Sequence, residues 1–188
     1  MSAYLVTGSS RGTGLELTRQ LASKPASEVS IVFATARSRS ARQFQELLQE
    51  NDFEKTLRVN VSGPHVTTRS FLPLLRKGLS KKIINMQTFV NYPAPSYKIS
   101  KAALNMMTVL YSQSLEEEGF TVICISPGWL KTDMGGSDAD LSVESGAEAT
   151  LNVIIKTDKE GNGRFFNIYV PGWEMNSGLN QYDGAELP

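Results

Sequence analysis

The chain of 188 residues contains little of what several classes of protein need. Its one cysteine, Cys124, excludes an internal disulfide and suits a reducing compartment. Its single histidine, His65, lies in no metal-ligand spacing, so no metal is expected. Nineteen basic and nineteen acidic residues leave no net charge to displace counterions from a nucleic acid. No apolar run approaches the ~18 residues of a membrane span, and "AYLVTG" is too short for a signal peptide. We expect a cytoplasmic protein that binds neither nucleic acid nor membrane.

Apolar runs alternate with segments of helical spacing along most of the chain. The apolar runs predict strands at 3–7, 28–37, 81–88 and 120–126. Helical spacing predicts helices at 14–23, 39–50, 52–75, 98–118 and 143–155, followed by a tail rich in Gly and Asn. This alternation predicts an α/β fold with a doubly wound parallel sheet, in a single domain over 1–188. Two helical segments, 39–50 and 52–75, follow each other where a regular alternation requires at least one strand.

The stretch "LVTGSSRGTGLEL" places three glycines between the first predicted strand and the first predicted helix. Gly8 allows a sharp turn off the strand, Gly12 lets the backbone approach a pyrophosphate, and Gly14 allows close packing of the helix on the sheet. The start of the helix offers free N–H groups to phosphates. A plain turn is the alternative, but strand and helix flank the glycines as in a Rossmann-like dinucleotide site. The expected cofactor-binding residues of this loop are Gly8, Ser10, Arg11, Gly12, Thr13 and Gly14.

The residues that end the second predicted strand favour NADP over NAD as the cofactor. An NAD site usually has an acidic residue there, which hydrogen-bonds the ribose 2′-OH. In this chain "ATARSRS" has no carboxylate and instead places Arg37 and Ser38 at that point, with Arg11 in the glycine loop. Guanidinium groups match a 2′-phosphate well.

Tyr97 and Lys101 lie four residues apart in "APSYKISKAALNMM", where a polar turn runs into a predicted helix. With six tyrosines in the chain, such a spacing also occurs by chance on a solvated helix. Residues i and i+4 share one helical face, however, and an ammonium beside a phenol favours the phenolate. A phenol whose pKa is lowered in this way could donate a proton to a carbonyl oxygen, or remove one in the reverse direction.

Three motifs, "TGSSRGTG", "YKISK" and "SPGWLKTDM", together resemble the short-chain dehydrogenase/reductase superfamily, in the same order along the chain. The segments "VNVSGPHV", "FLPLLRKG" and "YDGAELP" are similar to its carbonyl reductase and fungal ketoreductase branch. The resemblance implies an NADP(H)-dependent oxidoreductase that transfers hydride between the nicotinamide and a ketone, an aldehyde or a secondary alcohol. It also implies a small-molecule substrate and a homodimer or homotetramer.

The resemblance assigns a role to each matching position. Tyr97 would be the general acid/base, and Lys101 would lower its pKa and hold the nicotinamide ribose. Asn60 would support a water relay to Lys101. Pro127, Gly128 and Thr132 would contact the nicotinamide. Trp129 would lie near the substrate, with core packing as the alternative.

The chain departs from the family pattern in two places. The serine expected at the end of the "IIN" strand is absent, and Thr88, nine residues before Tyr97, is our candidate for its role. One or two central strands with the "NNAG" motif are also missing, and the join falls near residues 50–52, where the alternation failed. This loss leaves open two alternatives to an active enzyme: an NADP-binding regulator without turnover, and a non-functional truncated product.

Overall fold

The computed structural model describes residues 2–35, 53–87, 94–176 and 181–187. The chain begins with strand β1 (Ser2–Thr7), helix α1 (Gly12–Ala22) and strand β2 (Val29–Thr35). The two strands pair in parallel, with Tyr4 opposite Val32. The helix is the crossover connection that a parallel pair requires.

The second part of the chain contains the other elements of the fold. Helix α3 (Phe53–Leu57), π-helix η1 (Arg58–Ser62) and α4 (Gly63–Leu75) follow one another directly. They are followed by β3 (Lys82–Met86), α5 (Pro95–Ser114), β4 (Thr121–Ser126), α6 (Val143–Lys156), the 3-10 helix η2 (Lys159–Gly161), β5 (Phe165–Asn167) and β6 (Glu186–Leu187). Strands β3, β4 and β5 are parallel, and β6 is antiparallel to β5.

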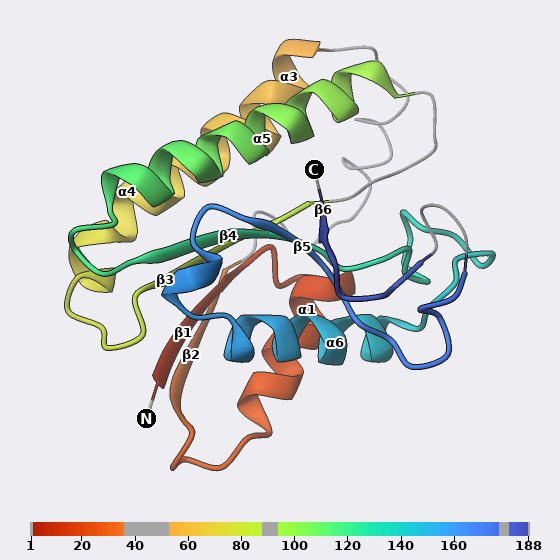
Figure 1. Cartoon of the computed structure of the whole chain (residues 1–188), viewed down its shortest axis with the longest axis horizontal. Coiled ribbons are helices and arrows are strands. Elements are labelled where there is room, and N and C mark those ends of the chain that lie inside the picture. Colours follow the sequence, from red (N-terminus) through yellow and green to blue (C-terminus); the bar gives the residue numbers. More distant parts are fainter. Residues whose placement is uncertain (1, 36–52, 88–93, 177–180, 188) are drawn as a thin grey trace.

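Helices cover both sides of the strands (Figure 1). Helices α4 and α5 lie together on one side, and α1 and α6 lie on the other. All six residues of β4 are buried, because this strand has neighbours on both edges and helices on both faces. The sequence prediction of a buried strand here is confirmed.

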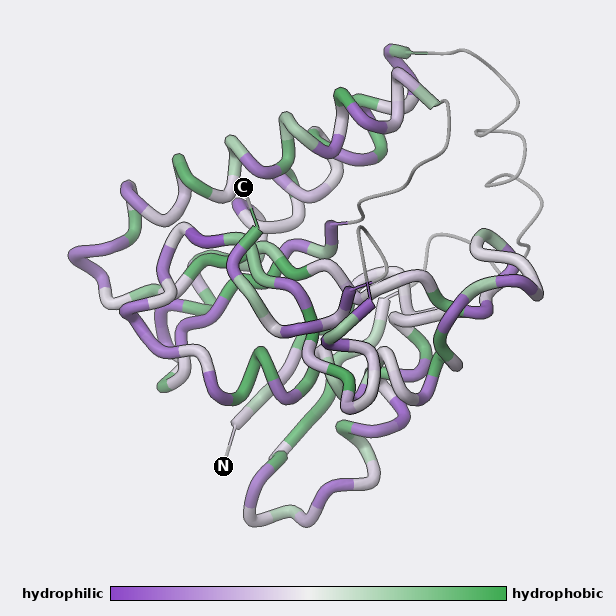
Figure 2. Tube along the Cα trace, turned by 45° about the vertical axis from the view of Figure 1, so that its right-hand side comes forward, coloured by the Kyte–Doolittle hydropathy of each residue, from purple (hydrophilic) through white to green (hydrophobic). Residues whose placement is uncertain are grey.

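Helix α5 has a buried face and an exposed face. Leu104 and Met107 are buried, whereas Met106 and Leu110 are more than half exposed. Figure 2 shows hydrophobic and hydrophilic residues alternating along this upper pair of helices, α4 and α5. The outer surface of the pair therefore keeps apolar side chains that no described part of the chain covers.

The strands form two sheets rather than one within the described residues. One sheet contains β1 and β2, and the other has the order β3-β4-β5-β6. The starts of β1 and β3 lie close together, since the hydroxyls of Ser2 and Ser80 are 3.3 Å apart. On β2, the side chains of Ile31 and Phe33 are 45% and 48% exposed. Among the described strands none joins β1 to β3, which is where the sequence lacked a strand.

Most of the predicted elements are confirmed, with three differences. Helix α5 begins at Pro95 instead of residue 98, because proline suits the first turn of a helix. The segment 53–75 is helical throughout but contains the π-helical turn η1. The predicted tail contains β5 and β6, two strands too short to show a pattern in the sequence. The predicted helix at 39–50 lies outside the described residues.

A substitution at Gly14 tests how closely α1 packs on the end of β1. A Cβ on Gly14 would lie 2.5 Å from the Gly8 carbonyl oxygen, which is backbone and has no rotamer to change. We expect Gly14→Ala to lower the free energy of unfolding in urea by about 1–3 kcal/mol. The matched control is Gly63→Ala, where the nearest atom to a Cβ is 3.5 Å away. In a helix this control should be neutral or stabilising by up to about 1 kcal/mol. Equal stability of the two variants would contradict the close packing.

Candidate active site

Three loops leave the carboxyl ends of parallel strands at one end of the fold. Gly8 follows β1, Gln87 follows β3, and Pro127 follows β4. Met86 lies opposite Ile125 in the sheet, and the Gln87 N–H donates to the Ile125 carbonyl at 2.8 Å. The loops after β3 and β4 therefore start side by side, at the edge where α/β sheets bind ligands.

Tyr97 and Lys101 lie in the first two turns of α5. The Lys101 ammonium is 5.5 Å from the centroid of the Tyr97 ring, close enough for a cation–π contact. The same ammonium donates to the Met86 carbonyl at 2.9 Å, which ties α5 to the end of β3. Burial of this amino group lowers the pKa of Lys101 to about 8, although the residue as a whole is only half-buried. The group is still mostly protonated at neutral pH.

Two further polar side chains hold the start of α5 in place. The side-chain amide of Gln87 donates to the Lys101 carbonyl and to Asn105 Oδ1, each at 3.0 Å. Ser100 is fully buried, and its hydroxyl donates to the Tyr97 carbonyl at 2.7 Å. Neither residue was singled out in the sequence, although Ser100 lies within "YKISK".

Asn60 lies in the π-helix η1 and reaches α5 from the side of the neighbouring helices. Its side-chain amide donates to Ser100 Oγ at 2.9 Å. A single π-helical turn inside a longer helix is uncommon and often marks a functional site. The structure thus brings Asn60 to the residue next to Lys101, through the Ser100 hydroxyl.

Two glycines of the glycine loop have a left-handed backbone conformation, which other residues rarely adopt. Gly8 and Gly12 have φ angles of 71° and 52°, in the left-handed region that favours glycine. Helix α1, which starts at Gly12, has no side-chain cap and no acidic residue in its first turn. Its first N–H groups are therefore available to an anion.

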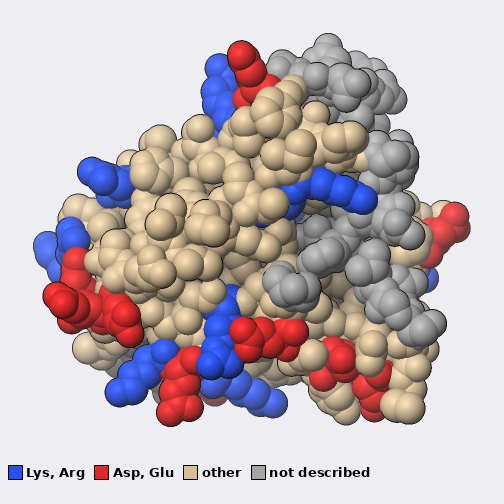
Figure 3. Space-filling view, turned by 45° about the horizontal axis from the view of Figure 1, so that its top comes forward, with Lys and Arg blue, Asp and Glu red and all other residues tan. Residues whose placement is uncertain are grey.

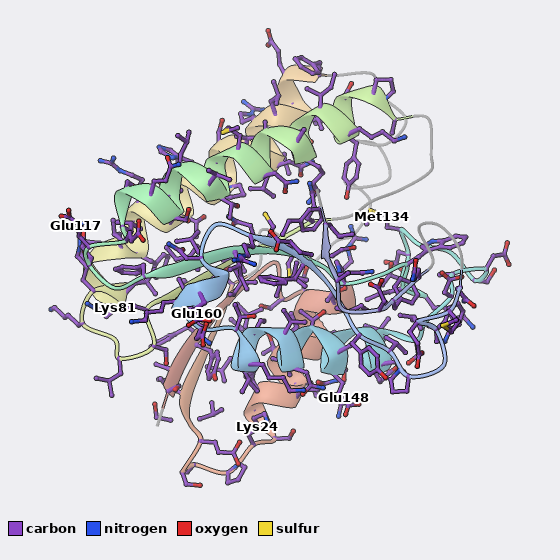
Figure 4. The ribbon with its side chains drawn as sticks, viewed as in Figure 1. Lys24, Lys81, Glu117, Met134, Glu148 and Glu160 are labelled. Atoms are coloured by element: carbon purple, nitrogen blue, oxygen red, sulfur yellow. The ribbon has the colours of Figure 1, made fainter. Side chains whose placement is uncertain are left out.

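The glycine loop lies against the segment that follows β4. A Cβ on Gly12 would lie 3.5 Å from Cγ2 of Thr132. The Arg11 guanidinium forms an ion pair of 3.1 Å with Asp133, across 122 positions in the chain. Met134, labelled in Figure 4, belongs to the same loop after β4. Residues from both sheets therefore face each other here.

The segment from Pro127 to Thr132 begins with a tightly packed glycine. Gly128 has a φ of 81°, and a Cβ there would lie 3.1 Å from side-chain atoms of Leu141, Ile168 and Tyr182. Trp129 is 38% exposed and donates through its indole N–H to the Gly135 carbonyl at 2.9 Å. Its side chain therefore lies at the surface rather than in the core.

The structure positions most but not all of the predicted site residues. Arg37, Ser38 and Thr88 lie outside the described residues. The others form two groups: Tyr97, Lys101 and Asn60 on α5 and η1, and the glycine loop with the segment from Pro127 to Thr132. Three residues that contact these groups were not named from the sequence: Gln87, Ser100 and Asp133.

Other possible sites are not supported by the described residues. No group of three or more metal-ligating side chains occurs in the part of the chain that the structure describes. Within the same ranges, no helix is long and apolar enough to cross a bilayer. Cys124 is 1% exposed, and burial raises the pKa of its thiol, as expected for a structural cysteine. His65 accepts from or donates to the Tyr111 hydroxyl at 3.0 Å.

Comparison with known proteins identifies similar chains. The C-signal of Myxococcus xanthus is 33% identical over 144 residues, covering 73% of this chain and 78% of that protein. An uncharacterized oxidoreductase of Schizosaccharomyces pombe is 25% identical over 98% of this chain and 97% of its own length. That alignment runs over 262 positions, more than this chain contains, so the yeast protein has residues without a counterpart here.

Solved structures show the same fold. The NADPH-bound carbonyl reductase from chicken fatty liver has a TM-score of 0.74 and 23% identity, over 89% of this chain and 96% of that one. The model of the family described as short chain dehydrogenase matches residues 27–141. With this match and the similarity to the C-signal, the chain belongs to the short chain dehydrogenase family.

Proposed function

We propose that this protein is an NADP(H)-dependent oxidoreductase that interconverts a ketone or aldehyde and the corresponding alcohol on a small organic substrate. The observation that carries the proposal is the Tyr97 phenol beside the buried Lys101 ammonium, at the carboxyl edge of β3. Membership of the short chain dehydrogenase family supports an oxidoreductase. The single buried cysteine suits action in the cytoplasm.

Tyr97 is the proposed general acid and base. Its phenol would donate a proton to the substrate oxygen in reduction and accept that proton in oxidation. The Lys101 ammonium would favour the ionised phenol and bind the ribose hydroxyls of the cofactor. Asn60 and Ser100 hold this turn of α5 through hydrogen bonds. Thr88 is the proposed hydroxyl donor to the substrate carbonyl.

The residues present fit a dinucleotide phosphate. The approach of α1 to Gly8 leaves no room for a Cβ at Gly14, and the start of α1 is uncapped. The proposed pyrophosphate contacts are with Gly8, Ser10, Gly12, Thr13 and Gly14. The proposed nicotinamide contacts are with Pro127, Gly128 and Thr132. When bound, the cofactor would supply the hydride.

Arginine side chains support NADP over NAD. Arg11 lies in the glycine loop, and Arg37 and Ser38 follow the described end of β2. The end of β2 has no carboxylate to bind a ribose 2′-OH. A guanidinium can bind a 2′-phosphate through two parallel hydrogen bonds. The NADPH-bound carbonyl reductase from chicken, which has the same fold, supports this cofactor.

We also propose that the chain, one domain over 1–188, lacks a segment near residues 50–52. The division of the described strands into two sheets and the extra residues of the yeast relative support this. The same observations favour one alternative function: a protein that binds NADP(H) without turnover. A parallel sheet that loses a central strand leaves backbone groups unpaired, which lowers stability and loosens the site.

A homodimer or homotetramer is the proposed assembly. Five large apolar side chains on α4 and α5 are each at least half exposed: Val66, Leu74, Ile99, Met106 and Leu110. Charged side chains are sparse at the centre of the face shown in Figure 3. A second copy would cover this apolar surface, since exposed apolar patches usually mark interaction sites.

Substitution of Tyr97 tests the proposed function. We expect the native chain to quench its tryptophan fluorescence on adding NADPH and to consume NADPH with members of a panel of ketones and aldehydes. Tyr97→Phe should bind NADPH with unchanged affinity but lose at least about 100-fold in kcat, because the proton donor is gone.

The outcomes separate the alternatives. Binding without turnover by folded native protein would favour the regulator, and absence of binding would contradict the whole proposal. Turnover by Tyr97→Phe at the native rate would contradict the acid/base role.

The pKa of Lys101 predicts how stability changes with pH. Burial lowers this pKa from its ordinary value of 10.5 to about 8 in the folded chain. Between these values the unfolded chain binds more protons, so this group adds stability as pH rises. The free energy of unfolding of the native chain minus that of Lys101→Met should therefore rise by about 2–3 kcal/mol from pH 7 to pH 10.

Urea unfolding at both pH values measures this difference. The contributions of titrating groups that the two proteins share cancel in it. The control is Lys98→Met, an exposed lysine of the same helix, which should leave the pH dependence unchanged. A constant offset between the native chain and Lys101→Met would show that the amino group is not buried.

Arg37 determines cofactor preference in this proposal. We expect Arg37→Asp to lower the ratio of NADH to NADPH dissociation constants at least about 10-fold, because a charge-assisted contact to the 2′-phosphate becomes a repulsion. Tryptophan quenching measures both constants without a substrate. An unchanged ratio would contradict the assignment.

A further inference from the structure

The phenol of Tyr182 is enclosed at the far end of the chain from the glycine loop. The residue is 1% exposed, and its ring lies 5.6 Å from that of Trp173. Its hydroxyl donates to Asp140 Oδ2 at 2.6 Å and accepts the backbone N–H of Trp129 at 3.1 Å. One side chain thus joins three segments: the C-terminal segment, the loop before α6, and the residue after Gly128.

The two segments that the hydroxyl joins are also bonded to each other. The Leu141 N–H donates to the Trp129 carbonyl at 3.1 Å, and the Lys131 N–H donates to the Leu141 carbonyl at 2.9 Å. Leu130 and Leu141 form a parallel bridge. The Tyr182 hydroxyl closes this short ladder at its start, where it accepts the N–H of Trp129.

The ring of Tyr182 lies directly behind Gly128. A Cβ on Gly128 would be 3.1 Å from Cε1 of Tyr182, so the ring limits how far this backbone can move. On the other side, Thr132 of the same segment lies against Gly12 of the glycine loop. The segment from Gly128 to Thr132 is therefore held between the Tyr182 ring and the proposed cofactor cleft.

Tyr182 is itself held firmly. The Val170 N–H donates to its carbonyl at 2.9 Å, and its own N–H donates to the Trp173 carbonyl at 3.3 Å. The Asn167 side chain donates to the carbonyl of the preceding residue, Gln181. The phenol is thus a fixed support rather than a side chain that adapts to its neighbours.

The hydroxyl does more than fill the core. A phenylalanine would bury the same ring without the need to pair a polar group, and a buried hydroxyl is costly unless it is paired. Burial, and then the hydrogen bond to Asp140, raise the pKa of Tyr182 above its ordinary value, so the group stays a neutral donor. It is unsuited to proton transfer, in contrast to Tyr97 beside its ammonium.

We propose that Tyr182 is a positioning residue that fixes the Gly128–Thr132 segment against the nicotinamide half of the cofactor, through its hydrogen bonds to Trp129 and Asp140. This inference rests on the proposed function. It assigns the C-terminal segment a role in binding one half of the dinucleotide, while the glycine loop holds the other half independently.

The test compares two ligands with the full chain. NADPH contains the nicotinamide, and adenosine 2′,5′-bisphosphate contains only the adenosine half. We expect Tyr182→Phe to weaken NADPH binding about fivefold, the change expected from loss of the one hydrogen bond made directly to the Gly128–Thr132 segment, and to leave the bisphosphate unchanged. Tryptophan fluorescence follows NADPH, and calorimetry follows both ligands.

Tyr111→Phe is the matched control. It removes a phenol that bonds His65 between α4 and α5, away from the Gly128–Thr132 segment. It should change neither affinity, even where it lowers the melting temperature as much as Tyr182→Phe. A second variant, Asp140→Ala, keeps the ring and removes the acceptor of its hydroxyl. It should repeat the selective loss of NADPH affinity, and it serves as the test where Tyr182→Phe fails to fold.

Two results would overturn the inference. Equal weakening of both ligands in Tyr182→Phe and Asp140→Ala would show a general structural role, and unchanged NADPH affinity in both would show none. Failure of the proposed function has a different signature, because the native chain would then bind neither ligand.

Discussion

The parallel pairing of β3 with β4 is the constraint on which the candidate site depends. It aligns the two strands so that Met86 lies opposite Ile125 and both strands end at the same edge of the sheet. One exit carries the Met86 carbonyl that holds the Lys101 ammonium, and the other leads to Gly128. The two faces of β4 pack into different apolar clusters, Ile123 and Ile125 in one and Val122 in another, so a slip of one residue would exchange them.

Two tyrosines at this edge have opposite electrostatic surroundings. The ring of Tyr97 lies 5.5 Å from the Lys101 ammonium, the contact on which its proposed acid/base role rests. Tyr182 donates to a carboxylate and is buried, which favours its neutral form. We therefore propose proton transfer for the phenol of Tyr97 and fixed hydrogen bonding for the phenol of Tyr182. The difference comes from Lys101 and Asp140, not from the tyrosines themselves.

Within the described residues, contacts between loops and between helices join the two sheets, and no strand does. Within the described residues the glycine loop contacts the second sheet's loops through Thr132 and the Arg11–Asp133 ion pair. Helices α1 and α6 also share an apolar cluster that includes Leu17 and Leu151. An exposed ion pair contributes little stability, so apolar packing of the helices is the main connection. A cofactor that bridges both sides would therefore stabilise the fold as well as occupy the site.

The sequence by itself determined the elements with strong local patterns and the residues within one motif. Apolar runs located β1, β3 and β4, glycines located the turn before α1, and a four-residue spacing located Tyr97 and Lys101 on one face of α5. Only the tertiary structure decided what pairs across the chain: Gln87 with Asn105, Arg11 with Asp133, and Tyr182 with Trp129. Strands β5 and β6 also emerged only there, because their few residues are strands by virtue of their neighbours. Local periodicity reports which face of an element is buried, whereas a hydrogen bond between residues far apart in sequence depends on the packing of several elements at once.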